Sequence, residues 1–270
     1  MAIITISRGS YSNGKKVAEK VAERLGYKCI SRDILLDASK RFQIPEVKLI
    51  RAIHDAPSIL DRFKHGKYIF VAYIRSALAS RAAGDNIVYH GLAGHFLLTG
   101  VPHVLKVRII ADMANRVESE MQRENISAGD ARLLLEKDDH ERRKWSKALY
   151  GVDPWKSSLY DLIIHIHKLT VSDAVDFICQ AALKEQFKTT ESGRQKMEDL
   201  ALACQVKAAL VDSFFDIRVT SEYGNVLIYT KDSYGQSSKL KKMLIKIESE
   251  LKGINNLEVH VGVTIPQNAI

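Results

Sequence analysis

Two glycines and a lysine near the start of the chain have the spacing of a phosphate-binding loop. Gly9 and the pair Gly14-Lys15 fit the pattern G-x-x-x-x-G-K, which here follows an apolar strand and opens an amphipathic helix. The glycines let backbone N–H groups turn toward an anion, the helix N-terminus adds partial positive charge, and the lysine adds a full charge. We therefore predict that a phosphorylated ligand is bound by the run Gly9, Ser10, Tyr11, Ser12, Asn13, Gly14, Lys15 and Lys16.

Position 16 departs from the usual motif. It normally carries a Ser or Thr whose hydroxyl holds Mg²⁺, whereas this chain has Lys16. Ser10 or Ser12 could substitute for that hydroxyl. An ordinary glycine-rich turn would also explain the spacing, but the position of the motif at the first strand-to-helix turn of the chain favours phosphate binding.

The elements that would position this loop alternate between strands and helices. Apolar strands are predicted at 2–7, 28–30, 86–90, 104–110 and 160–166, and helices at 14–25, 32–42, 46–53, 67–83, 112–123, 128–149 and 170–187. Strands that are apolar on both faces and separated by helices are typical of a parallel sheet covered on both sides. Residues 1–184 are therefore predicted to form an α/β domain with a doubly wound parallel sheet.

The pattern changes after a polar segment, 185–195, which we interpret as a linker. Beyond it the chain is predicted to form a smaller α+β domain over 196–270, in the order α-β-β-α-β. Its elements are predicted as a helix at 196–210, strands at 214–220 and 225–231, a helix at 236–252 and a strand at 256–264.

The net charge of +8 is unevenly distributed along the chain. Residues 185–270 contain eleven basic and eleven acidic residues, so the whole excess lies in 1–184, together with the glycine loop. A positive field there suits a polyanionic substrate such as a nucleotide. Nucleic acid is not an expected partner, because the sequence has no helix-turn-helix, aromatic RNA-binding or zinc motif.

The cysteines and the apolar runs indicate the compartment. Cys29, Cys179 and Cys204 are widely separated, form no metal-binding pattern and suit a reducing cytosol. No apolar run reaches the length of a membrane span, and no signal peptide is recognisable at the N-terminus. We therefore expect a cytoplasmic protein without a transmembrane segment.

Several ordered blocks of 1–184 resemble the cytidylate kinase-like family, a branch of the P-loop nucleoside monophosphate kinases. The most specific part runs from Glu136–Arg142 through Tyr150–Asp153 to Tyr160–Ile163. The other blocks are Ile4–Arg8 with its glycine loop, Ser31–Leu35, Ile87–Gly91 and Val104–Asp112.

This resemblance implies a P-loop kinase fold with a mobile lid, and transfer of the γ-phosphoryl group of ATP to a nucleoside monophosphate such as CMP or dCMP, with Mg²⁺. Lys15 would lie between the β- and γ-phosphates, and Arg142 on the lid would neutralise the transferring group. Asp139, one helical turn before Arg142, would share a face with it so that the two order each other. Arg32 and Asp33 would bind the acceptor. No residue is assigned as a protein ligand of a metal.

Three positions depart from the family pattern. Lys16 replaces a hydroxyl, Leu92 stands where the family has the arginine of Gly-Arg-Gly, and His165 with His167 replaces Asn-Thr. The two histidines share a strand face and could suit a metal, although polar residues at a sheet end explain them as well. These departures leave an alternative open: a catalytically weak or inactive nucleotide-binding regulator whose C-terminal domain senses or transmits a signal. A scaffold with a vestigial loop is a third possibility.

Residues 196–266 resemble a BON domain, a small fold associated with ligand or lipid binding. The resemblance rests on Gly224–Ile228 and Leu257–Val261. It implies an accessory role, in which this domain binds a small ligand or makes the protein a homo-oligomer. The neutral charge of the domain argues against an anionic membrane surface as its partner.

Overall fold

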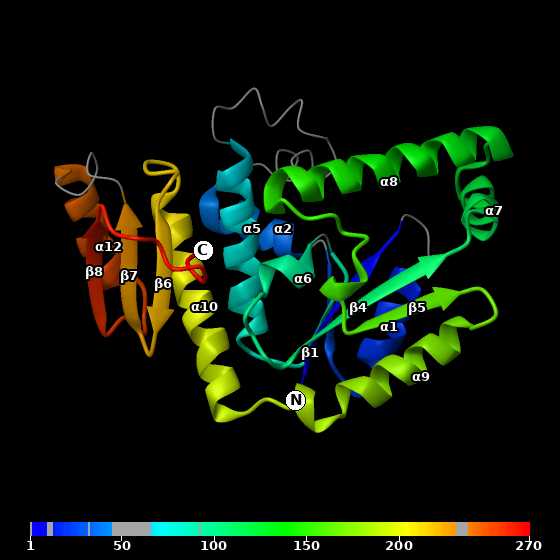
Figure 1. Cartoon of the computed structure of the whole chain (residues 1–270), viewed down its shortest axis with the longest axis horizontal. Helices are drawn as coiled ribbons and strands as arrows, with labels where there is room; N and C mark the ends of the chain where they lie inside the picture. Colours follow the sequence, from blue (N-terminus) through cyan, green and yellow to red (C-terminus); the bar gives the residue numbers. More distant parts are fainter. Residues whose placement is uncertain (1, 10–12, 32, 45–65, 92, 231–236) are drawn as a thin grey trace.

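The fold was analysed in a computed structural model, which describes residues 2–9, 13–31, 33–44, 66–91, 93–230 and 237–270. A five-stranded parallel sheet lies in its larger part, with the strand order β2-β3-β1-β4-β5 (Figure 1). The strands are β1 (Ile3–Arg8), β2 (Lys28–Ile30), β3 (Ile87–Tyr89), β4 (Val104–Ala111) and β5 (Leu162–Ile166). Because all five run parallel, their carboxyl ends meet at one edge, where doubly wound proteins bind ligands.

Helices cover both faces of this sheet, which confirms the predicted doubly wound α/β fold. On one face Ile4 and Ile6 pack with the apolar sides of α1 (Gly14–Leu25) and α9 (Val171–Ala182). On the other face Ile3 joins a second cluster, with helices α2 (Asp33–Phe42), α5 (Gly66–Ala82) and α6 (Gly94–Leu97). The alternation of β1 side chains between the two clusters explains why the first part of this strand carries isoleucines on both faces.

A pair of helices, α7 (Met113–Glu124) and α8 (Ala128–Tyr150), lies beyond the carboxyl edge of the sheet. Ser127 caps α8 by accepting a hydrogen bond from the backbone N–H of Asp130 at 3.2 Å. A short segment with a 3₁₀ helix, Ser157–Leu159, returns the chain from α8 to β5. This hairpin corresponds to the lid of the expected fold.

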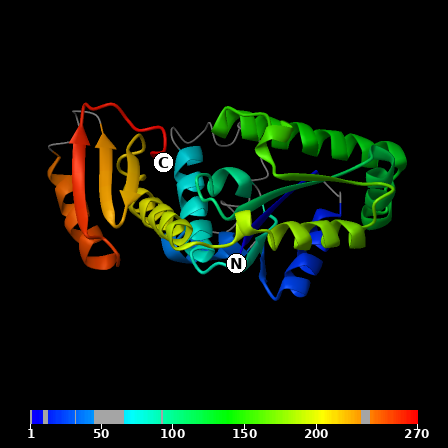
Figure 2. The same cartoon turned by 60° about the horizontal axis from the view of Figure 1, so that its bottom comes forward.

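The smaller part contains a three-stranded sheet in the order β6-β7-β8, with one antiparallel and one parallel pairing. Its elements are α10 (Glu191–Leu210), β6 (Arg218–Glu222), β7 (Asn225–Thr230), α12 (Ser238–Glu250) and β8 (Asn256–Val261). Figure 2 shows α10 between this sheet and α5. Apolar residues of α10 and α5 belong to one continuous core, and Tyr73 Oη donates a hydrogen bond to Asp212 Oδ2 at 2.5 Å.

The prediction differs from the structure mainly at element ends. Helix α10 begins at Glu191, inside the expected linker, because Thr190 caps it by accepting from the Gly193 N–H at 3.0 Å. The strand expected at 214–220 begins only at Arg218, since Phe214 and Ile217 still form turns. The short helix α6 was not predicted, and the helix predicted at 46–53 lies outside the described residues. No helix in the described part of the chain is long and apolar enough to cross a membrane.

Candidate active site

The described flanks of the glycine loop have the geometry of an anion site. Strand β1 ends at Arg8, and α1 begins at Gly14 after Asn13, which has left-handed backbone angles (φ 61°, ψ 6°) and forms no side-chain cap. Among the described residues, Asn13 therefore leaves the first helical turn without a side-chain cap of its own, as at helix N-termini that bind anions. Ser10, Tyr11 and Ser12, which we also predicted in this loop, lie outside the described residues.

Gly14 is required by the path of Arg8. A Cβ atom at position 14 would lie 2.7 Å from both Cβ and Cδ of Arg8, closer than real Cβ contacts. Gly9 approaches another cation, because a Cβ there would lie 3.7 Å from the guanidinium carbon of Arg116. Gly14 thus permits a close approach of backbone and arginine side chain, whereas at Gly9 a Cβ would be in ordinary van der Waals contact with Arg116.

The lid helices bring two arginines to this place. Arg142 on α8 donates through Nη1 to the carbonyl oxygen of Arg8 at 3.1 Å. Arg116 on α7 is buried and forms an ion pair with Asp139, with Nη1 and Oδ2 2.8 Å apart. The mutual ordering of Asp139 and Arg142 stays a prediction, and the packing of α7 along α8 adds Arg116 as a partner of Asp139. Arg116 was not predicted as a site residue, although its position one turn after the end of β4 was a usable signal.

The two lysines of the motif are exposed at the start of α1. Lys15 Nζ lies 3.7 Å from Glu19 Oε1, and both side chains are more than half exposed. A solvent-exposed pair of this kind is weak, so Lys15 can exchange Glu19 for a phosphate at little cost. Lys16 adds a second exposed charge at the same helix end.

The structure describes one of the two residues predicted to bind the acceptor. Asp33 is exposed in the first turn of α2, whereas Arg32 and Leu92 lie outside the described residues. The neighbouring glycines are explained by Tyr89, because a Cβ at Gly91 would lie 2.2 Å from its hydroxyl and one at Gly94 would lie 2.5 Å from its ring. The ring of Tyr89 therefore packs closely against the backbone at Gly91 and Gly94.

Two buried histidines lie near the carboxyl ends of the strands. Burial, reinforced by the charge of Arg8, lowers the pKa of His90 to about 4. Burial also lowers the pKa of His95 to about 3, with Lys106 and Arg108 contributing. His95 Nε2 lies 3.4 Å from the hydroxyl of Tyr160, which donates to the carbonyl oxygen of Pro154 at 2.8 Å. Both imidazoles are therefore neutral near pH 7.

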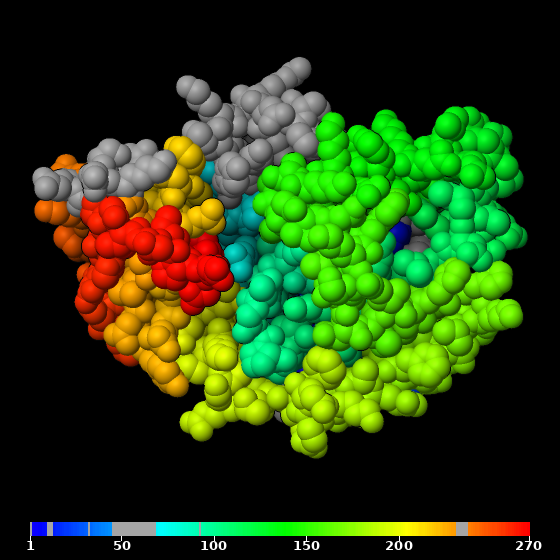
Figure 3. Space-filling view, viewed as in Figure 1, coloured from blue at the N-terminus to red at the C-terminus, as the bar shows by residue number. Residues whose placement is uncertain are grey.

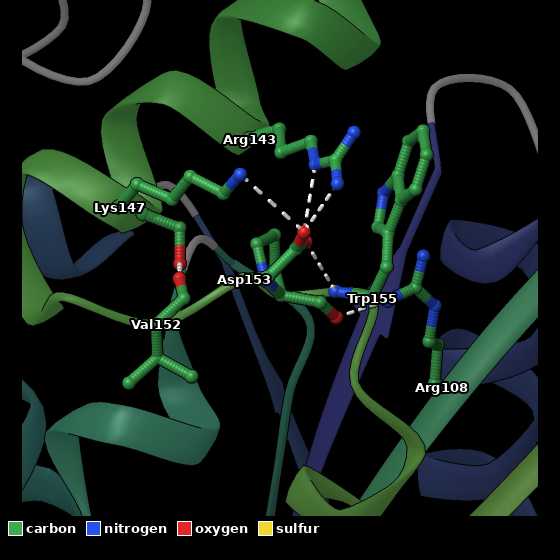
Figure 4. Close-up of polar contacts among 8 residues, drawn as sticks. Arg108, Arg143, Lys147, Val152, Asp153 and Trp155 are labelled. Atoms are coloured by element: carbon green, nitrogen blue, oxygen red, sulfur yellow. Dashed lines mark hydrogen bonds and ion pairs between the residues drawn. The ribbon is translucent and has the colours of Figure 1, made fainter.

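A second polar cluster follows the lid helix (Figure 4). Arg143 donates to Asp153 Oδ2 through Nε at 2.8 Å and Nη2 at 2.5 Å, and Lys147 Nζ lies 3.6 Å from the same oxygen. The hydrogen bonds from Arg143 are the main reason why the pKa of Asp153 is lowered. This cluster fixes the chain between α8 and β5; Arg143 was expected only as a further cation of the lid, and Asp153 was given no role in the site.

His165 and His167 share one acidic partner. The Nε2 atom of His165 lies 2.9 Å from Oδ1 of Asp112, and Nδ1 of His167 lies 2.7 Å from Oδ2. In the part of the chain that the structure describes, no group of three or more His, Cys, Asp or Glu side chains could hold a metal ion. Asp112 is thus an ion-pair partner of both histidines at the end of the sheet.

The arrangement fits a nucleotide polyphosphate. The α1 N-terminus, Arg116 and Arg142 lie at the end of β1, and Lys15 and Lys16 are exposed in the first turn of α1. Figure 3 shows a hollow where blue atoms of the N-terminal region lie behind the green lid region. A cluster of cations suits the charge of a triphosphate. Mg²⁺ commonly keeps several waters and binds through substrate phosphates, so it does not require a protein cage of carboxylates.

Comparisons with known proteins agree with this geometry. A model described as the cytidylate kinase-like family matches residues 3–168, and the chain belongs to that family. It is 25% identical over 201 residues to a cytidylate kinase of Pyrococcus horikoshii, covering 73% of this chain and 96% of that protein. It is also 25% identical over 176 residues to a cytidylate kinase of Sulfolobus acidocaldarius, covering 65% of this chain and 91% of that protein.

A solved structure shares the fold. An uncharacterized protein from Eubacterium ventriosum superposes with a TM-score of 0.52 at 20% identity, covering 67% of this chain and 98% of that chain. The matched 67% of the chain is about as long as the part that contains the five-stranded sheet.

Proposed function

We propose that this protein is an ATP-dependent kinase that transfers the γ-phosphoryl group to a nucleoside monophosphate of the CMP or dCMP type. The observation that supports it best is the convergence of Arg116 and Arg142 on the end of β1, where the uncapped N-terminus of α1 also begins. Membership of the cytidylate kinase-like family and similarity to two cytidylate kinases support the acceptor class.

The residues have complementary roles in this proposal. Backbone N–H groups of the glycine loop and α1 hold the donor's phosphates, and Lys15 moves from Glu19 to the β- and γ-phosphates. Arg142 places positive charge where it develops during transfer. Asp139 holds Arg116 over Gly9 and is a positioning residue. Bound Mg²⁺ would supply further neutralisation of the phosphates, while Arg32 and Asp33 contact the acceptor.

The test is release of ADP from Mg·ATP by the full chain with CMP, dCMP, UMP, AMP or GMP as acceptor. We expect acceptor-dependent ADP release with a cytidine nucleotide, and a loss of about 10³-fold in Lys15→Ala. Lys20→Ala, an exposed lysine on the same helix, is the matched control and should keep wild-type activity. ADP release that ignores both the acceptor and Lys15 would refute the proposal.

One contact favours an alternative function as a nucleotide-responsive regulator. Tyr73 on α5 bonds to Asp212, just after α10, so the kinase part and the C-terminal part are joined through α5. In this alternative, ATP binds without turnover and the accessory domain, proposed to span 196–270 and to be BON-like, transmits the bound state. ATP binding that requires Lys15, without ADP release, would favour it. We also propose that the C-terminal domain binds a small ligand or makes the protein a homo-oligomer, and that the protein is cytoplasmic.

A further inference from the structure

One large aromatic side chain beside the candidate site is exposed. The chain contains two tryptophans. Trp145 is 6% exposed and packs in the core, whereas Trp155, in the segment after α8, is 53% exposed. An indole surface that remains accessible next to a ligand site suits stacking against another aromatic ring.

Trp155 is held in place by its neighbours. Its backbone N–H donates to Asp153 Oδ1 at 3.1 Å, and the same carboxylate fixes the guanidinium of Arg143. That guanidinium lies over the indole, with Cζ 4.5 Å from the ring centroid. Figure 4 shows Arg143 to one side of the indole and Arg108 below it. A cation on one face leaves the rest of the ring surface for a ligand, and its charge is favourable near a phosphorylated molecule.

Contacts around Pro154 place this segment over the carboxyl ends of β1 and β4. Arg108 of β4 donates to the carbonyl oxygen of Pro154. The hydroxyl of Tyr160 donates to the same oxygen and lies 3.3 Å from Ser7 Oγ on β1. Ser7 and Arg108 are paired in the sheet register, directly before the glycine loop. Trp155 therefore belongs to the loop cluster at the ligand-binding edge.

The two faces of the sheet separate the expected donor side of the site from the expected acceptor side. Val107 and Ile109 pack on the α1 face, so Arg108 between them points to the opposite face, which α2 and α5 cover. The donor's phosphates are expected at the α1 N-terminus, and the predicted acceptor residue Asp33 starts α2. The segment of Trp155 lies on the acceptor side.

We propose that Trp155 stacks against the base of the acceptor nucleotide and thereby contributes to its binding. This inference rests on the proposed function. Stacking of a base on an aromatic side chain tolerates different bases but requires that a base is present. Trp155 would therefore favour nucleotides over phosphorylated sugars, while other groups distinguish cytosine from the other bases.

Fluorescence tests the contact without requiring turnover. In Trp145→Phe, Trp155 is the remaining tryptophan, and titration with CMP should quench its emission to saturation. Ribose 5-phosphate, which has the sugar and phosphate but no base, should leave the emission within a few per cent of its starting value. The double variant Trp145→Phe/Trp155→Phe gives the background. Equal responses to the two compounds, or no response to CMP, would overturn the inference.

Kinetics of the otherwise unchanged protein provide the second test. Trp155→Ala should raise the KM for the acceptor by about 10-fold, within the range measured for base stacking, with the KM for ATP within about twofold. Trp155→Tyr should restore most of the affinity. Phe177→Ala, an exposed aromatic on α9, is the control. Two kinetic results would refute the stacking inference and leave the kinase proposal intact. One is turnover by Trp155→Ala with an unchanged acceptor KM, and the other is a rise in the KM for ATP alone.

Absence of acceptor-dependent turnover in the wild-type protein would refute the kinase proposal. The fluorescence titration would then decide whether Trp155 stacks on the base.

Discussion

On the α1 side of the sheet edge, the backbone approaches charged side chains, whereas on the α5 side it approaches aromatic rings. Gly14 lies against Arg8 and Gly9 against Arg116, but Gly91 and Gly94 lie against Tyr89. Glycine is needed on both sides for close approach, yet the chemistry that approaches differs. We infer that the α1 side serves phosphate charge, whereas on the α5 side the buried ring of Tyr89 fixes the path of the backbone.

The largest expected effect removes charge from the α1 side. Arg142→Ala should lower kcat by about 10³-fold, equivalent to about 4 kcal/mol, because the transferring group loses its guanidinium. Steady-state ADP release measures it. Arg132→Ala, which removes an exposed arginine paired with Glu136 at 3.0 Å, is the control. Equal activity of the two variants would show that the α1 side is not specialised for phosphate charge.

The next effect tests the close approach at Gly14. Gly14→Ala should lower the free energy of unfolding by about 1–3 kcal/mol, because the new methyl group overlaps the side chain of Arg8. Urea denaturation measures this. In Gly129→Ala the added Cβ has Ser127 Oγ as its nearest neighbour, at 3.8 Å, so this variant should be neutral or more stable by up to about 1 kcal/mol. A stable Gly14→Ala protein would contradict the packing described here.

The pH dependence of stability tests burial near the α5 side. His95 has a pKa of about 3 in the folded protein and about 6.5 when unfolded. Below pH 6.5 the unfolded state binds more protons than the folded state. The free energy of unfolding should therefore decrease as the pH is lowered, by up to about 1.4 kcal/mol per pH unit for this residue. Urea denaturation at pH 7 and pH 5 should show a smaller loss in His95→Gln than in wild type. His140→Gln, at an exposed position on α8, should keep the wild-type loss, and a result in which both variants match wild type would exclude His95 as the cause.

The smallest effect concerns the support of Trp155. Asp153→Asn keeps the shape of the side chain but removes the charge that holds Arg143 and Lys147. We expect an increase of about threefold in the acceptor KM with little change in kcat, since partly exposed ion pairs contribute modestly. The control is Glu136→Gln, which changes an exposed ion pair on α8, the helix that carries Arg143 and Lys147. A loss of kcat instead would assign Asp153 to the chemical step.

The sequence predicted the architecture well because each strand and helix carries its own periodicity. The parallel sheet and the exact limits of α1 followed from apolar spacing and from Gly26 after the last turn. The start of α10 was missed because its first residues are polar and its cap, Thr190, was interpreted as part of a linker.

The spacing of the residues indicated a candidate site only where they are adjacent in the sequence, and Arg142 with the other distant candidates came from the family resemblance. The glycine loop is contiguous, so its spacing was informative. The pairing of Asp139 with Arg116 joins two helices, and the contact between Arg143 and Trp155 depends on how the chain turns after α8. Such long-range contacts depend on tertiary packing and leave no periodic pattern in one sequence.

The most direct test of the central claim follows the transferred group itself. Phosphorus NMR of the protein with Mg·ATP and CMP should show ADP and CDP appearing in equal amounts, with no inorganic phosphate, and in Lys15→Ala both products should form about 10³-fold more slowly. ADP with inorganic phosphate in place of CDP, or an unchanged spectrum, would contradict the assignment of the two sides of the sheet edge to a phosphoryl donor and a nucleotide acceptor.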